Sequence, residues 1–153
     1  MLELLAVHAG FDLSVSCKGD TQVDFHHSVE DVGICLGQAF FRALGDKRGI
    51  ARFADRLVPM DDAAAQIAVD ISGRPFLNFA DKMDGKIGQF DAELVEEFFR
   101  AFAFNAGVNL YIDLLKGGNM HHEAEAVFKA FAKCVRDAVQ IVSDNVPSSK
   151  GVL

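Results

Sequence analysis

The chain has 153 residues, of which 50% are hydrophobic and 24% charged, and this predicts one globular domain with a substantial core. Its net charge of −7 argues against a nucleic-acid or anionic-membrane partner, since both are bound through basic surfaces. No segment approaches the roughly 18 uninterrupted apolar residues of a membrane span, and the acidic start is unlike a secretory signal. We therefore expect a cytoplasmic protein.

The first third of the chain predicts a helix, a strand and a second helix. Residues 1–7 have the pattern of the end of an amphipathic helix that stops near Gly10. Residues 11–17 alternate apolar and polar side chains, which predicts a half-buried strand. Apolar positions at helical spacing predict a long helix over residues 27–44, closed by Gly45.

The rest of the chain predicts short strands followed by a second helix–strand–helix unit. Strands are expected at 51–57, 64–71 and 76–79, separated by turns at Pro59, Gly73 and Pro75. A loop at 84–86, a helix at 91–105 ended by Gly107, a strand at 108–115, a helix from 121 to about 142 and a polar tail follow. This order favours an α+β fold of helices packed on mixed β-sheets. We divide the single domain into two pseudo-repeats, about 1–50 and 91–145, with a strand region between them.

The three cysteines are odd in number and far apart, which indicates reduced thiols and argues against a zinc site with cysteine ligands. Cys35 and Cys134 fall on apolar faces of expected helices. We therefore expect both to lie in the core.

The pattern His-His-x-x-Glu occurs twice and uses four of the five histidines. It is found at His26-His27-Ser28-Val29-Glu30 and at His121-His122-Glu123-Ala124-Glu125. Neutral imidazoles beside carboxylates bind divalent metals. A single copy would more often be a solvated helix start, with the glutamate favoured by the helix dipole. Two copies in matching contexts reverse that balance and predict a metal centre.

Helix geometry suggests how such motifs work. Residues i and i+4 share a face, so His26 with Glu30, and His121 with Glu125, can each serve one ion. The adjacent histidine points about 100° away, so it must serve another ion. The simplest arrangement has two metals, each taking a His/Glu pair from one repeat and a histidine from the other. Ligands of this kind suit Mn, Fe, Zn or Ni.

Other residues could hold an anion. Arg52 and Arg74 could bind one bidentately, although a surface salt bridge is the ordinary role of an arginine. The tail supplies hydroxyls and an ammonium at Ser148, Ser149 and Lys150, which suit a phosphate, although such tails are often plain polar termini. Lys129 lies two turns beyond His122 and faces either the same site or solvent.

These residues together resemble the imidazoleglycerol-phosphate dehydratases of histidine biosynthesis. The resemblance runs the length of the chain and rests on Gly19-Asp20 with the first histidine motif, Leu44-Gly45-Asp46-Lys47-Arg48-Gly49-Ile50, Pro59-Met60-Asp61, Asp70-Ile71-Ser72-Gly73-Arg74-Pro75, the second motif through Phe131, and Pro147-Ser148-Ser149-Lys150-Gly151. It implies a duplicated α+β fold, two Mn ions per active site, and active sites shared between subunits of a large homo-oligomer. It also implies loss of water from imidazoleglycerol phosphate to give imidazole acetol phosphate.

The resemblance also assigns residues. It implies that His26, Glu30 and His122 bind one metal and that His27, His121 and Glu125 bind the other. Glu97 stands where many members have a metal-binding histidine. Substrate contacts are implied for His8, Arg52, Arg74, Lys129, Ser148, Ser149 and Lys150. A carboxylate near the metals would act as base, and Glu30 and Glu125 are the candidates present.

Three differences from the family pattern stand out. Members usually have a longer upstream segment that ends in Asp-His-Met-Leu, and Met1-Leu2 match its last two residues. We therefore expect the first repeat to lack its N-terminal strands and one metal ligand. Asp62 replaces a usual glutamate, and Tyr111 stands where histidine is common. The alternatives are an inactive, truncated metal-binding relative that folds and assembles without turnover, and a generic two-metal hydrolase.

Overall fold

The computed structural model describes residues 1–80 and 82–153. Its elements are, in chain order, α1 (Leu2–Ala9), α2 (His26–Leu44), β1 (Phe53–Met60), β2 (Ala63–Asp70), β3 (Phe76–Phe79), β4 (Lys86–Ile87), β5 (Phe90–Asp91), α3 (Leu94–Ala106), β6 (Asn109–Lys116) and α4 (Met120–Ala138). Helices packed on a mixed sheet confirm the predicted α+β class. No helix in this part of the chain is long and apolar enough to cross a membrane.

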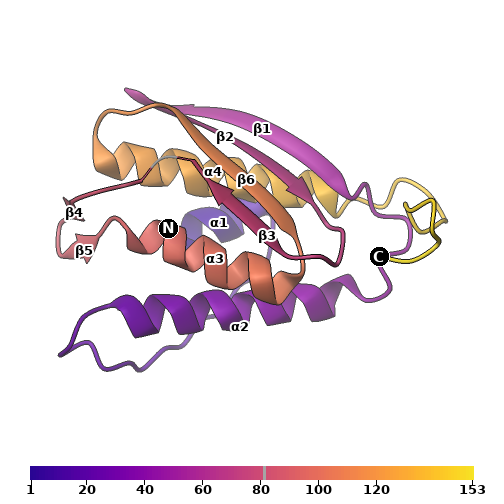
Figure 1. Cartoon of the computed structure of the whole chain (residues 1–153), viewed down its shortest axis with the longest axis horizontal. Helices are drawn as coiled ribbons and strands as arrows, with labels where there is room; N and C mark the ends of the chain where they lie inside the picture. Colours follow the sequence, from indigo (N-terminus) through magenta and orange to yellow (C-terminus); the bar gives the residue numbers. More distant parts are fainter. Residues whose placement is uncertain (81) are drawn as a thin grey trace.

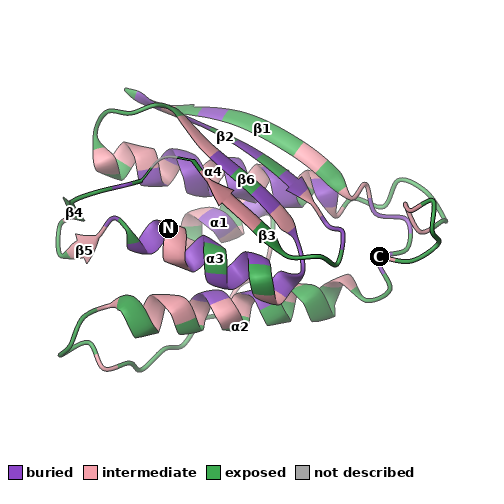
Figure 2. Ribbon diagram, in the orientation of Figure 1, coloured by how far each residue is buried: buried purple, intermediate pink, exposed green. Residues whose placement is uncertain are grey.

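The elements form three layers (Figure 1). The first is a four-stranded sheet in the order β1-β2-β6-β3, in which β3 runs parallel to β6 and the other neighbours are antiparallel. In the middle layer α4 packs on β1 and β2, and α3 packs on β3. In the third layer α1 packs on α4 and α2 on α3. Figure 2 shows that burial is concentrated in the middle layer, while α2 leaves much of its surface exposed.

Two glycines let α2 approach α3 closely. A Cβ added to Gly33 would lie 2.8 Å from the carbonyl oxygen of Phe98, and one added to Gly37 would lie 2.6 Å from that of Phe102. Neither position can take a larger side chain unless the helices move apart. Because α2 begins with the first histidine pair, this contact sets where that pair stands relative to the core.

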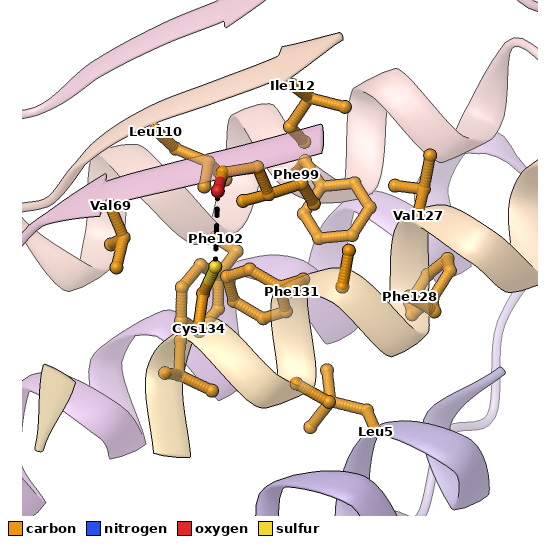
Figure 3. Close-up of a cluster of buried hydrophobic side chains, with 14 of the residues drawn as sticks. Leu5, Val69, Phe99, Phe102, Leu110, Ile112, Val127, Phe128, Phe131 and Cys134 are labelled. Atoms are coloured by element: carbon orange, nitrogen blue, oxygen red, sulfur yellow. Dashed lines mark hydrogen bonds between the residues drawn. The ribbon is translucent and has the colours of Figure 1, made fainter. Parts of the chain in front are cut away.

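An aromatic cluster joins α3 to α4 in the core of the middle layer (Figure 3). Phe99 is fully buried, and its ring centroid lies 4.9 Å from that of Phe128 and 5.0 Å from that of Phe131. Cys134 lies in the same core, where its thiol donates to the carbonyl oxygen of Ile67 and burial raises its pKa to about 12. Its predicted core position is confirmed.

Two expectations for the first half of the chain are wrong. Cys35, expected in the core, is exposed, because it lies on the side of α2 that faces away from α3. Residues 11–17 form no strand in the described structure. Alternation alone does not make a strand, which also needs a neighbouring chain to satisfy its backbone hydrogen bonds.

Three further boundaries differ from expectation. The loop expected at 84–86 leads into a short hairpin of β4 and β5. The strand expected to end at residue 57 continues through Pro59, which is tolerated because β1 is an edge strand. The last helix ends at Ala138 instead of near residue 142. Its continuation bonds to residues 49–52 instead, as when the Ala51 N–H donates to the carbonyl oxygen of Gln140.

We predict that Phe99→Ala lowers the free energy of unfolding by about 3–5 kcal/mol, since it empties a fully buried site that cannot collapse. Phe104→Ala on the same helix is the matched control, because its ring is 54% exposed, and it should change stability by less than about 0.5 kcal/mol. Denaturant unfolding of both variants measures the difference. Equal losses of unfolding free energy in the two variants would show that the aromatic cluster is not a main source of stability.

Candidate active site

The first histidine pair opens α2. The backbone N–H of His26 donates to a carboxylate oxygen of Asp24, 2.8 Å away, in place of a side-chain cap from Phe25. The Nδ1 atom of His27 lies 2.8 Å from a carboxylate oxygen of Asp20. This hydrogen bond raises the pKa of His27 and lowers that of Asp20. The His27 side chain is largely exposed and Asp20 is partly exposed, so the first pair stands in a solvent-facing loop and helix start.

The second pair opens α4 in a more ordered setting. The side chain of Asn119 caps the helix by accepting from the backbone N–H of His121, 2.9 Å away. The Nδ1 atom of His122 lies 2.8 Å from one oxygen of Asp62, and the other oxygen accepts from the N–H of Asn119. Asp62 lies in the turn between β1 and β2, so one carboxylate ties that hairpin to the start of α4. Its hydrogen bond raises the pKa of His122.

The two pairs have similar local geometry. Ring centroids are 6.2 Å apart in both, and the interplanar angles are 89° for His26–His27 and 74° for His121–His122. The Nε2 atom of His121 lies 3.6 Å from Glu125, as expected for residues four apart on a helix. The first motif has no corresponding ion pair between histidine and Glu30 in the part of the chain that the structure describes.

The beginnings of α2 and α4 flank one apolar cavity of about 450 Å³, with Ser28 and Val29 on one side and His121 and Ala124 on the other. Nevertheless, among residues 1–80 and 82–153, no three histidine, cysteine or carboxylate side chains converge closely enough to hold a metal. The two motifs with their aspartates are therefore separate groups within one chain, and we call each a half-site. The division of ligands into two mixed sets stays a prediction.

Glu125 is held by a lysine as well as by its histidine neighbour. The Nζ atom of Lys129 lies 2.8 Å from Glu125 and donates to the sulfur of Met60, 3.2 Å away. This lysine contact is the main cause that lowers the pKa of Glu125. The sequence left open whether Lys129 faces the histidine motif or solvent. In the structure it faces the second half-site.

Two other expected site residues stand apart from the histidine pairs. Glu97 lies in the first turn of α3 and His8 in the last turn of α1, both half-buried. Neither side chain makes a hydrogen bond or ion pair within the described residues. Their predicted roles, a metal ligand and a substrate contact, stay predictions.

The residues expected to bind an anion gather at the other end of β1. Arg52 donates through Nε and Nη2 to both carboxylate oxygens of Asp70 and through Nη1 to the carbonyl oxygen of Pro147, 2.8 Å away. This last bond anchors the polar tail next to Arg52. Within the tail, the N–H of Lys150 donates to the hydroxyl of Ser148. Ser149 and Lys150 are exposed.

Arg74 joins this group through its own turn. The preceding Gly73 has a φ of 75°, and a Cβ there would lie 2.9 Å from the backbone of Leu153 at the end of the tail. The Arg74 side chain is exposed and makes no ion pair in the part of the chain that is described. Arg52, Arg74 and the tail therefore form one cluster, which we call the anion cluster.

The anion cluster is far from the histidine pairs (Figure 1). Arg52 precedes β1, whereas Asp62, which holds His122, follows it, and an eight-residue strand spans about 24 Å. Independently, the N–H of Arg52 bonds to the carbonyl oxygen of Ala138, and the helix from His122 to Ala138 is also about 24 Å long. Both routes give the same separation, so one chain holds the two groups at opposite ends.

Sequence reasoning gave no role to two aspartates that the structure places at the site. Asp20 and Asp62 orient the second histidine of each pair. Asp20 lies seven residues before its histidine, within reach of a local argument from the loop. Asp62 lies 60 residues before its own, and only the pairing of β1 with β2 and the start of α4 bring it there.

We predict that Asp62→Asn lowers the pKa of His122 toward the ordinary histidine value of about 6.5, because the carboxylate charge that favours the protonated ring is lost. The pKa of His27 should not change, since its partner is Asp20, and this ring serves as the internal control. NMR titration of the metal-free protein measures both rings. An unaltered pKa of His122 would contradict its pairing with Asp62.

Known proteins resemble this chain over most of its length. A family model described as imidazoleglycerol-phosphate dehydratase matches residues 1–135. The chain is 58% identical to the imidazoleglycerol-phosphate dehydratase of Azorhizobium caulinodans and 53% identical to that of Heliobacterium modesticaldum. In both cases the match covers all of this chain and 80% of the relative.

Solved structures of the same enzyme share the fold. Imidazoleglycerol-phosphate dehydratase from Staphylococcus aureus superimposes with a TM-score of 0.85 and 44% identity, over 92% of this chain and 81% of that one. The enzyme from Pyrococcus furiosus gives a TM-score of 0.81 and 33% identity, over 99% and 83%. The chain belongs to the imidazoleglycerol-phosphate dehydratase family and is therefore a dehydratase, that is, a hydro-lyase.

Proposed function

We propose that this chain converts imidazoleglycerol phosphate to imidazole acetol phosphate in histidine biosynthesis, at sites that each hold two Mn ions. The separation of two kinds of donor along α4 supports this best. Histidines and carboxylates that suit a metal-bound imidazole stand at one end, and cations that suit a phosphate gather at the other. The substrate carries the same two groups, joined by a short carbon chain.

The histidine motifs fit a divalent metal. In each pair the second histidine has its Nδ1 bonded to an aspartate, an arrangement by which proteins orient an imidazole whose Nε2 binds a metal. Glu125 adds an oxygen donor on the face of His121. Nitrogen and oxygen donors without thiolates are compatible with Mn. Bound Mn would supply Lewis-acid polarisation of the substrate's imidazole ring and orient it.

The two motif glutamates differ in a way that divides their proposed roles. Lys129 keeps Glu125 anionic by lowering its pKa, which suits a cation ligand and disfavours proton uptake. Glu30 has no ion-pair partner among the described residues, and the repeat places Ile34 where Lys129 stands. Of these two carboxylates, we therefore assign to Glu30 the acceptance of the carbon-bound proton that leaves with the hydroxyl group.

A complete site needs more than one chain. The histidine pairs and the anion cluster are about 24 Å apart within a chain, whereas three carbons separate the ring and phosphate of the substrate. We therefore infer a homo-oligomer in which each site takes its histidines and its anion cluster from different chains. The same arrangement supplies the ligands that each half-site lacks.

We expect the assembled protein to bind about two Mn per chain at neutral pH, because each chain carries two half-sites. His122→Ala should bind markedly less, since that imidazole is the best-ordered donor of the second motif. His8→Ala is the control, because His8 is expected to contact the substrate and not the metals. This variant should bind as much Mn as the unmodified protein. Metal analysis and calorimetry provide the readout. Absence of bound Mn in the unmodified protein, with excess Mn present, would refute the metal assignment.

Mixing two inactive variants tests the shared site. His122→Ala removes a metal donor and Arg74→Ala removes an anion-binding cation, so each alone should lose most dehydratase activity. When the two variants are co-assembled in equal amounts, up to roughly one site in four should be active. Such a site takes its histidines from an Arg74→Ala chain and its anion cluster from a His122→Ala chain. Mixing His122→Ala with Asp62→Ala is the matched control, because both defects fall on the same half, and it should stay inactive. A mixture of the first pair with no recovery would place the whole site within one chain.

A further inference from the structure

Lys47 is the one charged residue that the structure buries among residues 1–80 and 82–153, with 4% of its surface exposed. Its ammonium lies 5.3 Å from the ring centroid of Phe41 and has no hydrogen bond or ion pair in the described residues. The side chain is almost wholly covered, but Nζ is not among the described buried polar atoms that lack a partner, so the ammonium itself reaches the surface. There it contacts the ring of Phe41 and can bind an anion.

The amine is directed into the anion cluster. A Cβ added to Gly73 would lie 3.3 Å from Nζ of Lys47, and the same position touches the end of the tail at Leu153. Arg74 follows Gly73 directly, and its guanidinium is exposed without a carboxylate partner in the described structure. Lys47 thus lies beneath the turn that carries Arg74 and beside the tail that carries the serines.

The neighbouring carboxylate of Asp70 is bound by Arg52 and not by Lys47. Both of its oxygens accept from Arg52, and no ion pair joins it to Lys47 among the described residues. Burial, with a smaller contribution from the charge of Arg52, lowers the pKa of Lys47. The positive charges of Lys47 and Arg52 therefore repel each other, which favours a bound anion beside them.

The backbone indicates that the position is held in place. Lys47 has a φ of 58° and Arg52 a φ of 72°, and both values are uncommon for residues with a side chain. Such conformations persist where the surrounding structure enforces them, and they often occur at binding sites. Both residues with this uncommon backbone conformation have cationic side chains at the anion cluster.

We propose that Lys47 is a further phosphate-binding residue, whose ammonium neutralises the substrate's phosphate together with Arg52 and Arg74. This rests on the proposed function, since it assumes that the anion cluster receives the phosphate. Burial of the side chain holds the ammonium in place beside the turn that carries Arg74.

The test uses the assembled, Mn-loaded protein and inorganic phosphate as the probe. Lys47→Met should weaken phosphate binding at least about 10-fold in calorimetry and raise KM with little change in kcat, because a charge-assisted contact to the non-reacting end is lost. Lys47→Arg keeps the charge and should retain most of the affinity. Lys86→Met removes an equal charge from an exposed position on β4, at the opposite end of the molecule from the tail, and should bind phosphate normally (Figure 1).

Thermal unfolding separates binding from a structural role. Without phosphate, Lys47→Met should unfold at nearly the same temperature as the unmodified protein, because the methionine chain keeps the packing of the buried lysine methylenes. Phosphate should raise the midpoint of the unmodified protein and raise that of Lys47→Met much less. Should Lys47→Met fail to fold, Lys47→Gln takes its place with the same expectations.

The outcomes distinguish this inference from the proposal it rests on. Unchanged phosphate affinity in Lys47→Met, together with a loss in Arg74→Ala, would overturn the role of Lys47 and leave the anion cluster intact. Unchanged affinity in both variants would show that the cluster itself does not receive the phosphate. Loss in both, with Lys47→Arg and Lys86→Met retaining affinity, is the result expected.

Discussion

Helix α4 packs against β1 and β2 on one side and against α1 on the other, and this burial holds the second histidine motif and the anion cluster in place at its two ends. Its first turn carries His121 and His122, and the carbonyl oxygen of its last residue accepts from the backbone N–H of Arg52. A close-packed helix cannot slide or shorten without opening the core. The separation between metal donors and anion cluster is therefore a fixed length, which no side-chain rotation can remove, and this is why we infer that catalysis requires assembly.

Backbone strain is concentrated at the two ends of that fixed length. Lys47, Arg52 and Asp61 are the non-glycine residues with positive φ in the part of the chain described. Asp61 opens the two-residue turn that places Asp62 against His122, while the other two belong to the anion cluster. Each such conformation costs about 1–3 kcal/mol, which only a well-packed fold can offset. The aromatic core around Phe99 thus supports the geometry of residues that it never touches.

The sequence predicted what depends on near neighbours. Helical periodicity and terminal glycines placed α2, α3 and the start of α4 within a few residues, and the repeated motif identified the histidines. The strand expected at residues 11–17 was wrong because alternation shows which side chains share a face, whereas a strand also needs a hydrogen-bonded neighbour. The role of Asp62 and the burial of Lys47 were out of reach for a similar reason. Both arise from contacts between segments that only the folded chain brings together.

The two histidine motifs are alike in sequence and ring geometry, yet their surroundings prepare them to different degrees. His122 is 29% exposed and held by a carboxylate from a rigid hairpin, and Lys129 fixes the nearby Glu125. His27 is 63% exposed, its aspartate comes from a segment without regular structure, and Glu30 has no ion pair with a lysine or arginine among the described residues. The second motif is therefore more constrained than the first, because contacts from the β1–β2 turn and from Lys129 fix its side chains.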